Sequence, residues 1–364
     1  MNDITIDKTG WKKYRFGDVA IQTKEIVDMD NTELTRYVAG EHMNSEDIHI
    51  RRWGTVGDGY LGPAFIRRFH KGDILYGSRR TYLKKVAIAD FDGITANTTF
   101  VIKPKEELIE PVLLVHLMLS KSFTEYSVTN SRGSVNPYIN WKDIADYEFL
   151  LPPKPEQKRL AALLWAADEM IEKEKVELEK VFIIKNQFIE QTQIQLVQKT
   201  KDKYRLGDIV TLNYGKALKE SDRIEGKYYV VGSSGISGTH TSFIVNGPGI
   251  VVGRKGAAGS VVWVDNNFWP IDTAYWVSMK RNDIDIKYIY ILLQSLNLPQ
   301  LSITTAIPGL NREDVYEQIV YISSTKDQKR IIDEYNKITT SIEKIPVVIK
   351  QSQQIKQELI NKTF

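Results

Sequence analysis

Cysteine is absent from the 364 residues of this chain. Disulfide bonds and zinc sites built on thiolates are therefore excluded, which suits a reducing compartment. Long apolar runs are absent too. The first residues, MNDITIDKTGWKKYRFGD, lack the apolar core of a signal peptide, and no run reaches the roughly 18 residues of a membrane span. We expect a cytoplasmic protein without a membrane segment.

A marked excess of one charge is also missing. The chain has 49 Lys and Arg against 46 Asp and Glu, a net charge of +3, which by itself indicates no anionic partner. With 42% hydrophobic and 26% charged residues, the composition is that of a folded globular protein. Its length suits about two domains.

The motifs of common catalytic sites are missing as well. No P-loop GxxxxGK[ST] occurs, since VVGRKGAAGS has its glycines in another order, and ATP hydrolysis is therefore unsupported. VNPYIN (135–140) has one proline where the amine-holding corner of a methyltransferase has two. The histidines lack HxH or HxxxH spacing, and the acidic residues of 172–180 belong to a charged helix face. We expect no catalytic residue, metal site or cofactor in this chain.

What the sequence does contain is an internal repeat. Four pairs of similar segments occur in the same order, and the last two pairs are separated by the same 171 residues. The pairs are YRFGDV and YRLGDI (from Tyr14 and Tyr204), DILYGSRR and GIVVGRKG (73–80 and 249–256), PYINWKDI and PGLNREDV (from Pro137 and Pro308), and QKR twice (from Gln157 and Gln328). The order indicates two related halves, 1 to about 200 and about 201 to 364.

The first part of each half has the pattern of short strands. Residues 85–88, 99–102, 249–252 and 260–264 are β-branched stretches bounded by Gly, Asp or Asn. Such segments, separated by loops, predict a compact α+β domain in each half.

The first half ends in a predicted long amphipathic helix, from about residue 156 to 198. Its apolar residues recur at spacings of three, four and seven, while Glu and Lys fill the other faces. This apolar stripe consists of Leu160, Leu164, Ala167, Ile171, Leu178, Phe182, Ile189 and Leu196. Pro153 and Pro155 mark the start of the helix. At roughly 60 Å, the helix is too long for the core of a small domain.

The second half ends in a similar pattern from Lys326. Its stripe consists of Ile331, Tyr335, Ile338, Ile342, Ile345, Ile349, Ile355 and Leu359. This copy lacks the leading proline, and Pro346 lies inside it. Because proline cannot donate the helical hydrogen bond, we expect a kink or break near Ile345.

We therefore predict an α+β protein in which two modules are separated by two long helices that form an antiparallel coiled coil, with pseudo-twofold internal symmetry. The predicted limits are 1–154 and 201–325 for the modules, and 155–200 and 326–364 for the helices. In the alternatives, each helix packs on its own module or pairs with another subunit.

Basic residues gather in the first half. Between Arg51 and Lys85 nine Lys or Arg stand against two acids, interleaved with Trp53, Tyr60, Tyr76 and Tyr82. Such density is typical of a surface that neutralises DNA phosphates, although these residues could instead simply face water along strands. The candidate DNA-binding residues of this half are Arg51, Arg52, Arg67, Arg68, Arg79, Arg80, Lys84 and Arg132.

The second half offers two loops, GSSGISGTHTSF (232–243) and GRKGAAGS (253–260). Arg can bind guanine and Ser or Thr can bind several bases, so the loops could enter a DNA groove. They could equally be plain turns. The candidates here are Lys216, Ser233, Ser234, His240, Arg254 and Lys255.

Taken together, YRFGDV, GDILYGSRRTYLKKVAIADFDGI, INWKDI and LPPKPEQKRLAALL, with their counterparts in the second half, resemble the specificity subunit of type I restriction-modification systems. The resemblance covers essentially the whole chain. It implies that each module is a target recognition domain for one half of a bipartite double-stranded DNA site. It also implies that the helices set the spacing between the half-sites, near one DNA turn of about 34 Å, and dock the modification subunits.

The same resemblance implies a non-catalytic chain with no cofactor of its own. Its partners would be two modification subunits, which bind S-adenosylmethionine and methylate adenine, and restriction subunits, which use ATP and Mg to translocate and cleave DNA. Two alternatives are the recognition end of a fused restriction-methylation enzyme and a protein-binding adaptor without DNA contact. The basic run from Arg51 to Lys85 argues against the adaptor.

Overall fold

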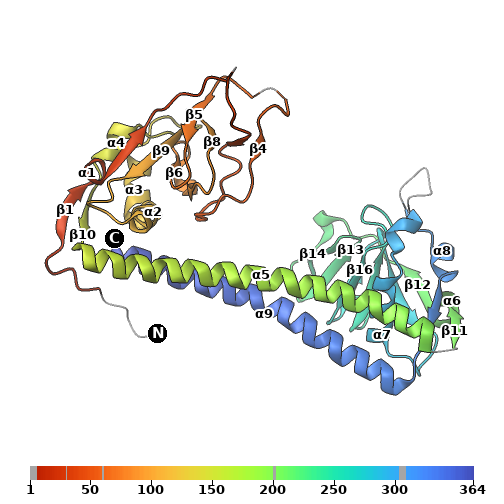
Figure 1. Ribbon diagram of the computed structural model, residues 1–364. Coiled ribbons are helices and arrows are strands. Elements are labelled where there is room, and N and C mark those ends of the chain that lie inside the picture. Colours follow the sequence, from red (N-terminus) through yellow and green to blue (C-terminus); the bar gives the residue numbers. More distant parts are fainter. Residues whose placement is uncertain (1–5, 30, 60, 200–201, 303–308) are drawn as a thin grey trace. The chain divides into compact units, whose positions relative to one another are not determined.

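The computed structural model describes residues 6–29, 31–59, 61–199, 202–302 and 309–364. Residues 200 and 201, at a predicted domain limit, lie outside the described residues, as do Pro308 of the repeat and Tyr60 of the basic run. The chain divides into two compact units (Figure 1), Met1–Lys175 with Val347–Phe364 and Val176–Pro346. Each unit contains one module and a part of both long helices.

The module of the first unit is built on two four-stranded sheets. Their strand orders are β2-β9-β6-β7 and β4-β3-β8-β5, and a short β1-β10 pair joins the ends of the module. In chain order its elements are β1 Lys12–Arg15, α1 Phe16–Val19, β2 Ala20–Thr23, β3 Arg36–Val38, β4 Gly54–Thr55, β5 Phe65–Phe69, β6 Ile74–Gly77, η1 Thr81–Leu83, β7 Val86–Ile88, β8 Gly93–Ala96, β9 Thr99–Pro104, α2 Pro111–Leu117, α3 Lys121–Thr129, α4 Trp141–Ala145 and β10 Glu148–Leu151.

The module of the second unit repeats the main sheet as β12-β18-β15-β16, with a three-stranded sheet β14-β13-β17 and a short β11-β19 pair. Its elements are β11 Lys203–Arg205, α6 Leu206–Ile209, β12 Val210–Tyr214, η2 Glu220–Asp222, β13 Tyr228–Gly232, β14 Gly235–His240, β15 Gly249–Gly253, β16 Val261–Val264, β17 Phe268–Pro270, β18 Ala274–Met279, α7 Ile286–Ser295, η3 Leu298–Ser302, α8 Arg312–Tyr316 and β19 Ile319–Tyr321. The four predicted strand segments correspond to β7, β9, β15 and β16.

The repeated YRFGDV motif forms a short helix in each module, which packs against a second short helix. The Arg15 N–H donates to the Asp18 carboxylate (2.9 Å), which starts the short helix α1, and Phe16 is fully buried. A Cβ on Gly17 would lie 3.0 Å from the Cβ of Ala145 in α4. In the second module a Cβ on Gly207 would lie 2.8 Å from the Cβ of Tyr316. Glycine therefore recurs in the motif because two short helices pass close together.

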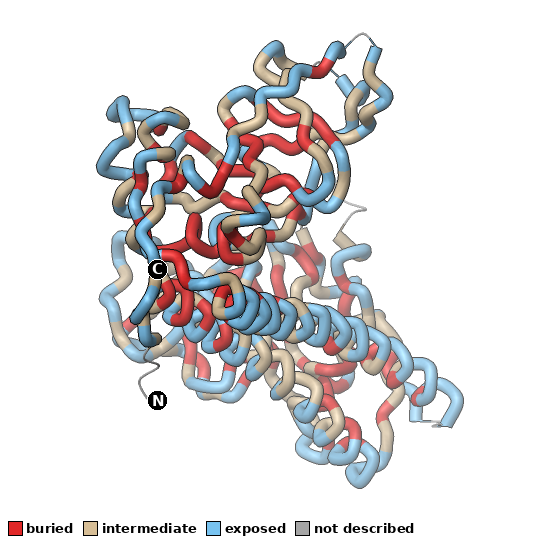
Figure 2. Tube along the Cα trace, turned by 60° about the vertical axis from the view of Figure 1, so that its left-hand side comes forward, coloured by how far each residue is buried: buried red, intermediate tan, exposed pale blue. Residues whose placement is uncertain are grey.

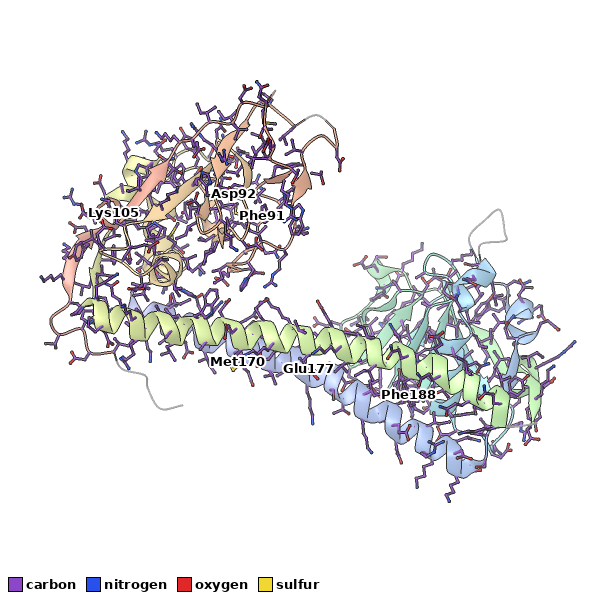
Figure 3. All side chains as sticks on the ribbon, in the orientation of Figure 1. Phe91, Asp92, Lys105, Met170, Glu177 and Phe188 are labelled. Atoms are coloured by element: carbon purple, nitrogen blue, oxygen red, sulfur yellow. The ribbon has the colours of Figure 1, made fainter. Side chains whose placement is uncertain are left out.

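In both modules a lysine side chain donates a hydrogen bond to a carbonyl of this short helix. The Nζ of Lys105 (labelled in Figure 3) donates to the carbonyl of Asp18 at 2.9 Å. The Nζ of Lys280 donates to the carbonyl of Gly207 at 2.5 Å. In both cases the short helix leaves its last carbonyls without intrahelical partners, and a cation satisfies one of them.

The inner strands of the main sheets are buried on both faces, as Figure 2 shows by the red segments inside each module. In the first module Ile74 pairs with Ile102 and Leu75 with Val101. In the second, Val251 pairs with Trp276. Strands covered on both sides carry continuous apolar runs, which explains the sequences ILYG and GIVVG.

Helix α5, Lys154–Lys199, has 46 residues and begins beside the two prolines, as predicted. Figure 2 shows that much of its surface is exposed. Of the predicted stripe, Leu160, Leu164, Ile171, Ile189 and Leu196 are buried, but Phe182 is 45% exposed and Val181 is buried in its place. The error arises because Val181, Phe182, Ile183 and Ile184 are consecutive apolar residues. Any one of them could continue the stripe, so the spacing alone does not show which one is buried.

Helix α9, Thr325–Thr363, is continuous through Pro346, so the predicted break is wrong. A proline removes one helical hydrogen bond at a cost of about 3 kcal/mol, and packing of the long flanking segments holds the helix together. At its start, the Ser324 hydroxyl accepts a hydrogen bond from the Asp327 N–H (3.2 Å) and donates one to the Asp327 carboxylate (2.7 Å). This serine cap replaces the prolines of the first helix.

The buried face of α9 also differs from the prediction near its end. Ile355 is 43% exposed, whereas Ser352 and Lys356 are buried. These two continue the three- and four-residue spacing between Ile349 and Leu359. The apolar pattern failed here because the buried positions carry polar side chains.

The two helices run antiparallel in each unit, as predicted (Figure 1). In the first unit Lys356 Nζ lies 2.6 Å from Asp168 Oδ1, and Ser352 Oγ lies 3.1 Å from Glu174 Oε1. In the second unit the rings of Phe188 and Tyr335 are 6.3 Å apart.

Each helix packs on both modules, whereas the first alternative had each helix on its own module only. Leu160 and Leu164 of α5 and Leu359 of α9 belong to the core of the first module. Ile331 and Tyr335 of α9, with Ile189 and Leu196 of α5, belong to that of the second. The helix pair therefore extends each core instead of standing apart from it.

A buried glutamine fixes the start of α5. The amide of Gln157 donates to the carbonyls of Leu108 and Pro152, both at 2.9 Å. Its Oε1 accepts from the N–H of Glu110, the residue before α2, at 3.0 Å. One side chain thus joins the long helix to the strand before it and to a helix of the module.

Gln328 repeats this arrangement at the start of α9. Its amide donates to the carbonyl of Ser323 and its Oε1 accepts from the N–H of Asp285, the residue before α7, both at 3.0 Å. The repeated QKR is therefore explained by its glutamine, which ties each long helix to its module. Among the described residues, no helix is both long and apolar enough to cross a membrane.

Candidate nucleic-acid interface

The first basic cluster, defined here as Arg79, Arg80 and Arg132 around Tyr138, is formed by two loops. Arg79 and Arg80 lie just after strand β6, separated from it by Ser78. The Arg80 N–H donates to the carbonyl of Pro137 (2.7 Å), and Arg132 and Tyr138 exchange backbone hydrogen bonds of 2.8 and 2.9 Å. Backbone pairing thus brings together residues that are about fifty positions apart in the sequence.

The side chains of the first cluster are accessible. Arg79 and Arg80 are exposed, and the guanidinium of Arg79 lies 5.9 Å from the centre of the Tyr138 ring. Arg132 is 3.4 Å from Asp143, the only acid paired with the three arginines in the part of the chain that the structure describes. The cluster therefore keeps a net positive charge beside an exposed aromatic ring.

The second basic cluster, Arg254, Lys255 and Arg312 around Tyr214, has the same construction. The Leu310 N–H donates to the carbonyl of Arg254 (2.8 Å), which ties the loop after β15 to the segment before α8. The guanidinium carbons of Arg254 and Arg312 lie 5.2 and 5.4 Å from the Tyr214 ring. This ring is 54% exposed.

Tyr275 packs against Tyr214 of the second cluster and holds the neighbouring segment in place. Its ring centre is 5.2 Å from that of Tyr214, and its hydroxyl donates to the carbonyl of Leu310 at 3.0 Å. Burial, with the neighbouring Tyr214, raises the pKa of Tyr275 to about 12 although Arg254 and Arg312 oppose the shift. The phenol therefore stays protonated and donates at neutral pH.

Sequence analysis missed Arg312. It lies in LNREDV, at the position that Trp141 occupies in INWKDI of the first half. Aligning the two copies of the repeat would have indicated Arg312, because there a basic residue replaces the aromatic Trp141 of the first copy.

Most of the basic run from Arg51 to Lys85 does not join the first cluster. Arg51 binds Glu172 through two hydrogen bonds of 2.5 Å and also pairs with Asp47. The other paired residues are Arg68, which lies beside Glu25 and Asp92 (3.5 and 3.8 Å), and Lys84, which is 2.6 Å from Glu46. Among the described residues, acids from outside the run thus pair with three of its nine basic residues and reduce the predicted local charge excess.

Two further candidates of the run bind backbone oxygens. An Arg52 guanidinium N–H donates to the carbonyl of Glu41 (2.9 Å), and one of Arg67 donates to the carbonyl of Lys24 (2.8 Å). Neither residue contacts the first cluster through a hydrogen bond or ion pair among the described residues.

The serine-rich loop of the second half is only partly accessible. Ser233 and His240 are each 9% exposed, and His240 Nδ1 accepts a hydrogen bond from the N–H of Ile224 (3.1 Å). The His240 side chain thus holds the loop to the preceding segment. The burial of both side chains does not favour the prediction that they contact DNA. Ser234 and Lys216 are exposed, and Lys216 Nζ is 5.8 Å from the Trp269 ring.

A family model described as "Type I restriction modification DNA specificity domain" matches residues 8–181 and again residues 198–351. The chain belongs to this family. The two matches correspond to the two halves of the internal repeat, so the specificity domain occurs here twice.

Curated relatives of this specificity-domain chain include two named subunits. It is 31% identical over 170 residues to the type I restriction enzyme EcoDI specificity subunit of Escherichia coli, which is 45% of this chain and 37% of that protein. It is 34% identical over 154 residues to the MjaIX specificity subunit of Methanocaldococcus jannaschii, which is 40% and 35% of the two chains. The matched segments span little more than a third of these relatives.

Solved structures share the fold over nearly the full length. The type I restriction-modification S subunit from M. genitalium superposes with a TM-score of 0.63 at 17% identity, over 99% of this chain and 98% of that chain. A chain from a structure concerned with complex assembly and conformational transition of the type I R-M system gives 0.63 at 18%, over 98% and 97%.

Outside the basic clusters, Asp47, His49 and Glu172 place possible metal ligands within 4.8 Å of one another. The guanidinium of Arg51 lies between the two carboxylates, and His49 Nε2 lies 2.6 Å from Asp168. These groups already satisfy one another, so the arrangement is an ion-pair network and does not fit a metal site.

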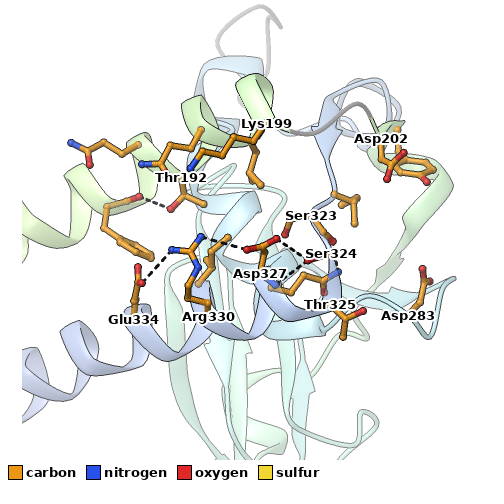
Figure 4. A pocket seen from close by; sticks show the side chains of 18 of the residues that line it. Thr192, Lys199, Asp202, Asp283, Ser323, Ser324, Thr325, Asp327, Arg330 and Glu334 are labelled. Atoms are coloured by element: carbon orange, nitrogen blue, oxygen red, sulfur yellow. Dashed lines mark hydrogen bonds and ion pairs between the residues drawn. The ribbon is translucent and has the colours of Figure 1, made fainter.

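A polar pocket of about 620 Å³ lies at the start of α9 in the second unit (Figure 4). Its wall includes the capping pair Ser324 and Asp327, and Arg330, which lies 3.5 Å from Glu334. Lys199 and Arg281 add positive charge, but further acids line the same wall. Mixed charge gives no preference for an anion, and the pocket is not part of the nucleic-acid interface.

Proposed function

We propose that this protein is the DNA-recognition subunit of a type I restriction-modification complex. Each module contacts one half of a bipartite double-stranded DNA site through its basic cluster. The first cluster offers the exposed Arg79 and Arg80, and the second offers the exposed Lys255 beside the partly exposed Arg254. Such side chains can bind phosphates, and arginine can bind the edge of guanine. An exposed tyrosine in each cluster adds an aromatic face.

The observation that carries this proposal is the duplication of the site. In both modules the loop after the central strand carries adjacent basic residues and is hydrogen-bonded to the segment before a short helix. Similarity to named specificity subunits supports the same conclusion.

The rest of the proposal concerns the helices and the partners. We infer that α5 and α9 set the distance between the half-sites and dock two modification subunits, with restriction subunits joining the complex. Catalysis, S-adenosylmethionine, ATP and Mg then belong to the partners, and the complex works in the cytoplasm, where its DNA substrate is.

The test is to map methylated adenines in cells that contain this chain with its modification subunit. A split motif with a constant gap is expected. Arg79→Ala with Arg80→Ala should relax or lose one part of the motif, and Arg254→Ala with Lys255→Ala the other part, because the two clusters lie in different modules. The matched control is Lys13→Ala, because Lys13 is an exposed residue of β1 beside Glu148 and lies outside both clusters and both long helices.

An uninterrupted motif, or equal loss of both parts in either double variant, contradicts the two-module proposal. Unchanged methylation in both double variants contradicts the assignment of the clusters.

A further inference from the structure

In the first unit, the edge of the main sheet is covered by an extended segment of the chain itself. His49 forms a parallel bridge with Ile88 of strand β7, and the Ile88 N–H donates to the carbonyl of Ile48 at 2.8 Å. Ile48 and Ile50 are buried. The segment 47–51 therefore acts as an added edge strand with its isoleucines turned inward.

The basic residues of this segment reach helix α5. His49 Nε2 lies 2.6 Å from Asp168, and Arg51 binds Glu172 with two hydrogen bonds of 2.5 Å. Alternating apolar and basic residues thus join the sheet edge to the acidic face of the helix.

The second unit has the same sheet edge without such a segment. Strand β16 ends the sheet β12-β18-β15-β16 and, among the described residues, pairs only with β15. The Gly253 N–H donates to the carbonyl of Ser260 (2.9 Å), and the alternation of an antiparallel pair then directs the backbone groups of Val261 and Trp263 away from β15. Such an edge is a template for another strand.

Beside this edge lies a groove of about 540 Å³. Its lining comes from strand β16, from Lys287 and Tyr290 of α7, and from α9 with Tyr335, Thr339 and Glu343. The groove is thus bounded by the elements equivalent to those that hold segment 47–51 in the first unit, namely an edge strand and the long helix of the same half.

The charge of the groove matches that template at one position, since Thr339 stands at the repeat position of Asp168 and Lys287 also lines the groove. Glu343 follows Glu172 by the repeat interval of 171 residues. It is exposed and has no ion-pair partner within 4.0 Å among the described residues. Asp265, which accepts a hydrogen bond from the Trp263 indole (2.6 Å), adds a second carboxylate to the lining.

We propose that the edge of β16 binds an extended segment of a partner polypeptide as an added parallel strand. Its residues alternate between apolar side chains, which turn towards the module as Ile48 and Ile50 do in the first unit, and basic ones, which face α9, where one binds Glu343. Main-chain hydrogen bonds supply the affinity and the alternating side chains the specificity, as in other cases of strand addition. This inference does not depend on DNA recognition.

The probe is a synthetic peptide with the sequence of this chain's own segment, SEDIHIRRW (45–53), added to the full-length protein. Calorimetry should show saturable binding, and hydrogen exchange should slow at the amides of 261–264. Glu343→Gln should weaken binding about three- to tenfold, the usual effect of losing one charge-assisted hydrogen bond at an accessible site.

Two controls isolate the mode of binding. Glu225→Gln, an exposed acid away from the groove, should leave the affinity unchanged. A peptide N-methylated at both isoleucines lacks N–H groups that an added strand donates, and it should bind more than about tenfold more weakly.

The proposal is overturned by absent binding, by equal binding of the N-methylated or a scrambled peptide, or by an affinity that Glu343→Gln does not change. Slower exchange at 86–88 in place of 261–264 would also overturn it, because the peptide would then have displaced the internal segment of the first unit.

Discussion

At the scale of single residues, the neighbours of a charged side chain decide what it can contact. Arg51 and Arg79 belong to the same basic run. Arg51 is bound by two carboxylates. Arg79, in contrast, is exposed, and its guanidinium lies over the ring of Tyr138. Breaking the pairs of Arg51 to bind DNA would leave Glu172 and Asp47 without a partner, so only Arg79 is ready to bind a phosphate.

The surroundings of His116 likewise decide its charge, and they keep this side chain neutral. It is fully buried in α2, and its Nδ1–H donates to the carbonyl of Val112 at 2.7 Å. Burial, reinforced by the charge of Lys356, lowers the pKa of His116 to about 4. The folded state therefore holds a neutral imidazole over a range in which the unfolded chain, with a pKa near 6.5, takes up a proton.

The first unit should accordingly lose stability as the pH falls from 6.5 towards 4. For a base with a lowered folded pKa the loss begins below the unfolded pKa and ends at the folded one, and it amounts to about 2 kcal/mol between pH 7 and pH 5. His116→Leu should remove this part of the pH dependence in urea unfolding followed by tryptophan fluorescence. An identical pH dependence in the variant and the parent would contradict the assignment.

At the scale of elements, the helix pair is specified by polar contacts as well as by its apolar stripe. Asp168 and Lys356 are both buried, 2.6 Å apart, and Asp168 also binds His49. Although burial opposes it, the hydrogen bonds from His49 and Lys356 hold the pKa of Asp168 well below its usual value. The carboxylate thus joins α5, α9 and the edge segment of the module in one network.

Lys356→Met should destabilise the first unit by about 3 kcal/mol, because it leaves a buried carboxylate with half of its compensation. Adding Asp168→Leu should recover most of the loss, since no buried charge then remains. Thermal or urea unfolding of both variants measures the difference.

Lys350→Met is the matched control, because Lys350 is exposed on the same helix. Its effect should stay within about 0.5 kcal/mol. If the double variant were less stable than Lys356→Met, the network would contribute in some way other than charge compensation.

At the scale of the whole molecule, one construction plan is used twice along a single chain. The same strand order in the main sheet, the same glycine at the crossing of two short helices and the same buried glutamine occur in both units. A net charge of +3 conceals two local basic clusters, one in each module. DNA affinity should therefore depend on these clusters and not on total charge.

The dependence of DNA affinity on salt tests this distribution. The logarithm of the binding constant should fall steeply with the logarithm of salt concentration, and Arg79→Ala with Arg80→Ala should reduce the slope by about 2 if both residues contact phosphates. Arg51→Ala, which removes a neutralised arginine, should not reduce the slope. If both variants reduced the slope equally, DNA affinity would depend on total charge and not on the position of the charged residues.

The sequence by itself determined the repeat, the α+β class, four strands of the main sheets (β7, β9, β15 and β16) and the two long helices. Local rules suffice for these features, because apolar periodicity and turn residues are set by neighbours along the chain. The tertiary structure alone decided that α9 continues through Pro346, that Lys356 replaces Ile355 on the buried face, and that Arg312 stands beside Tyr214 while Arg51 is neutralised. Each of these depends on partners far away in the sequence, and their position is known only once the chain has folded.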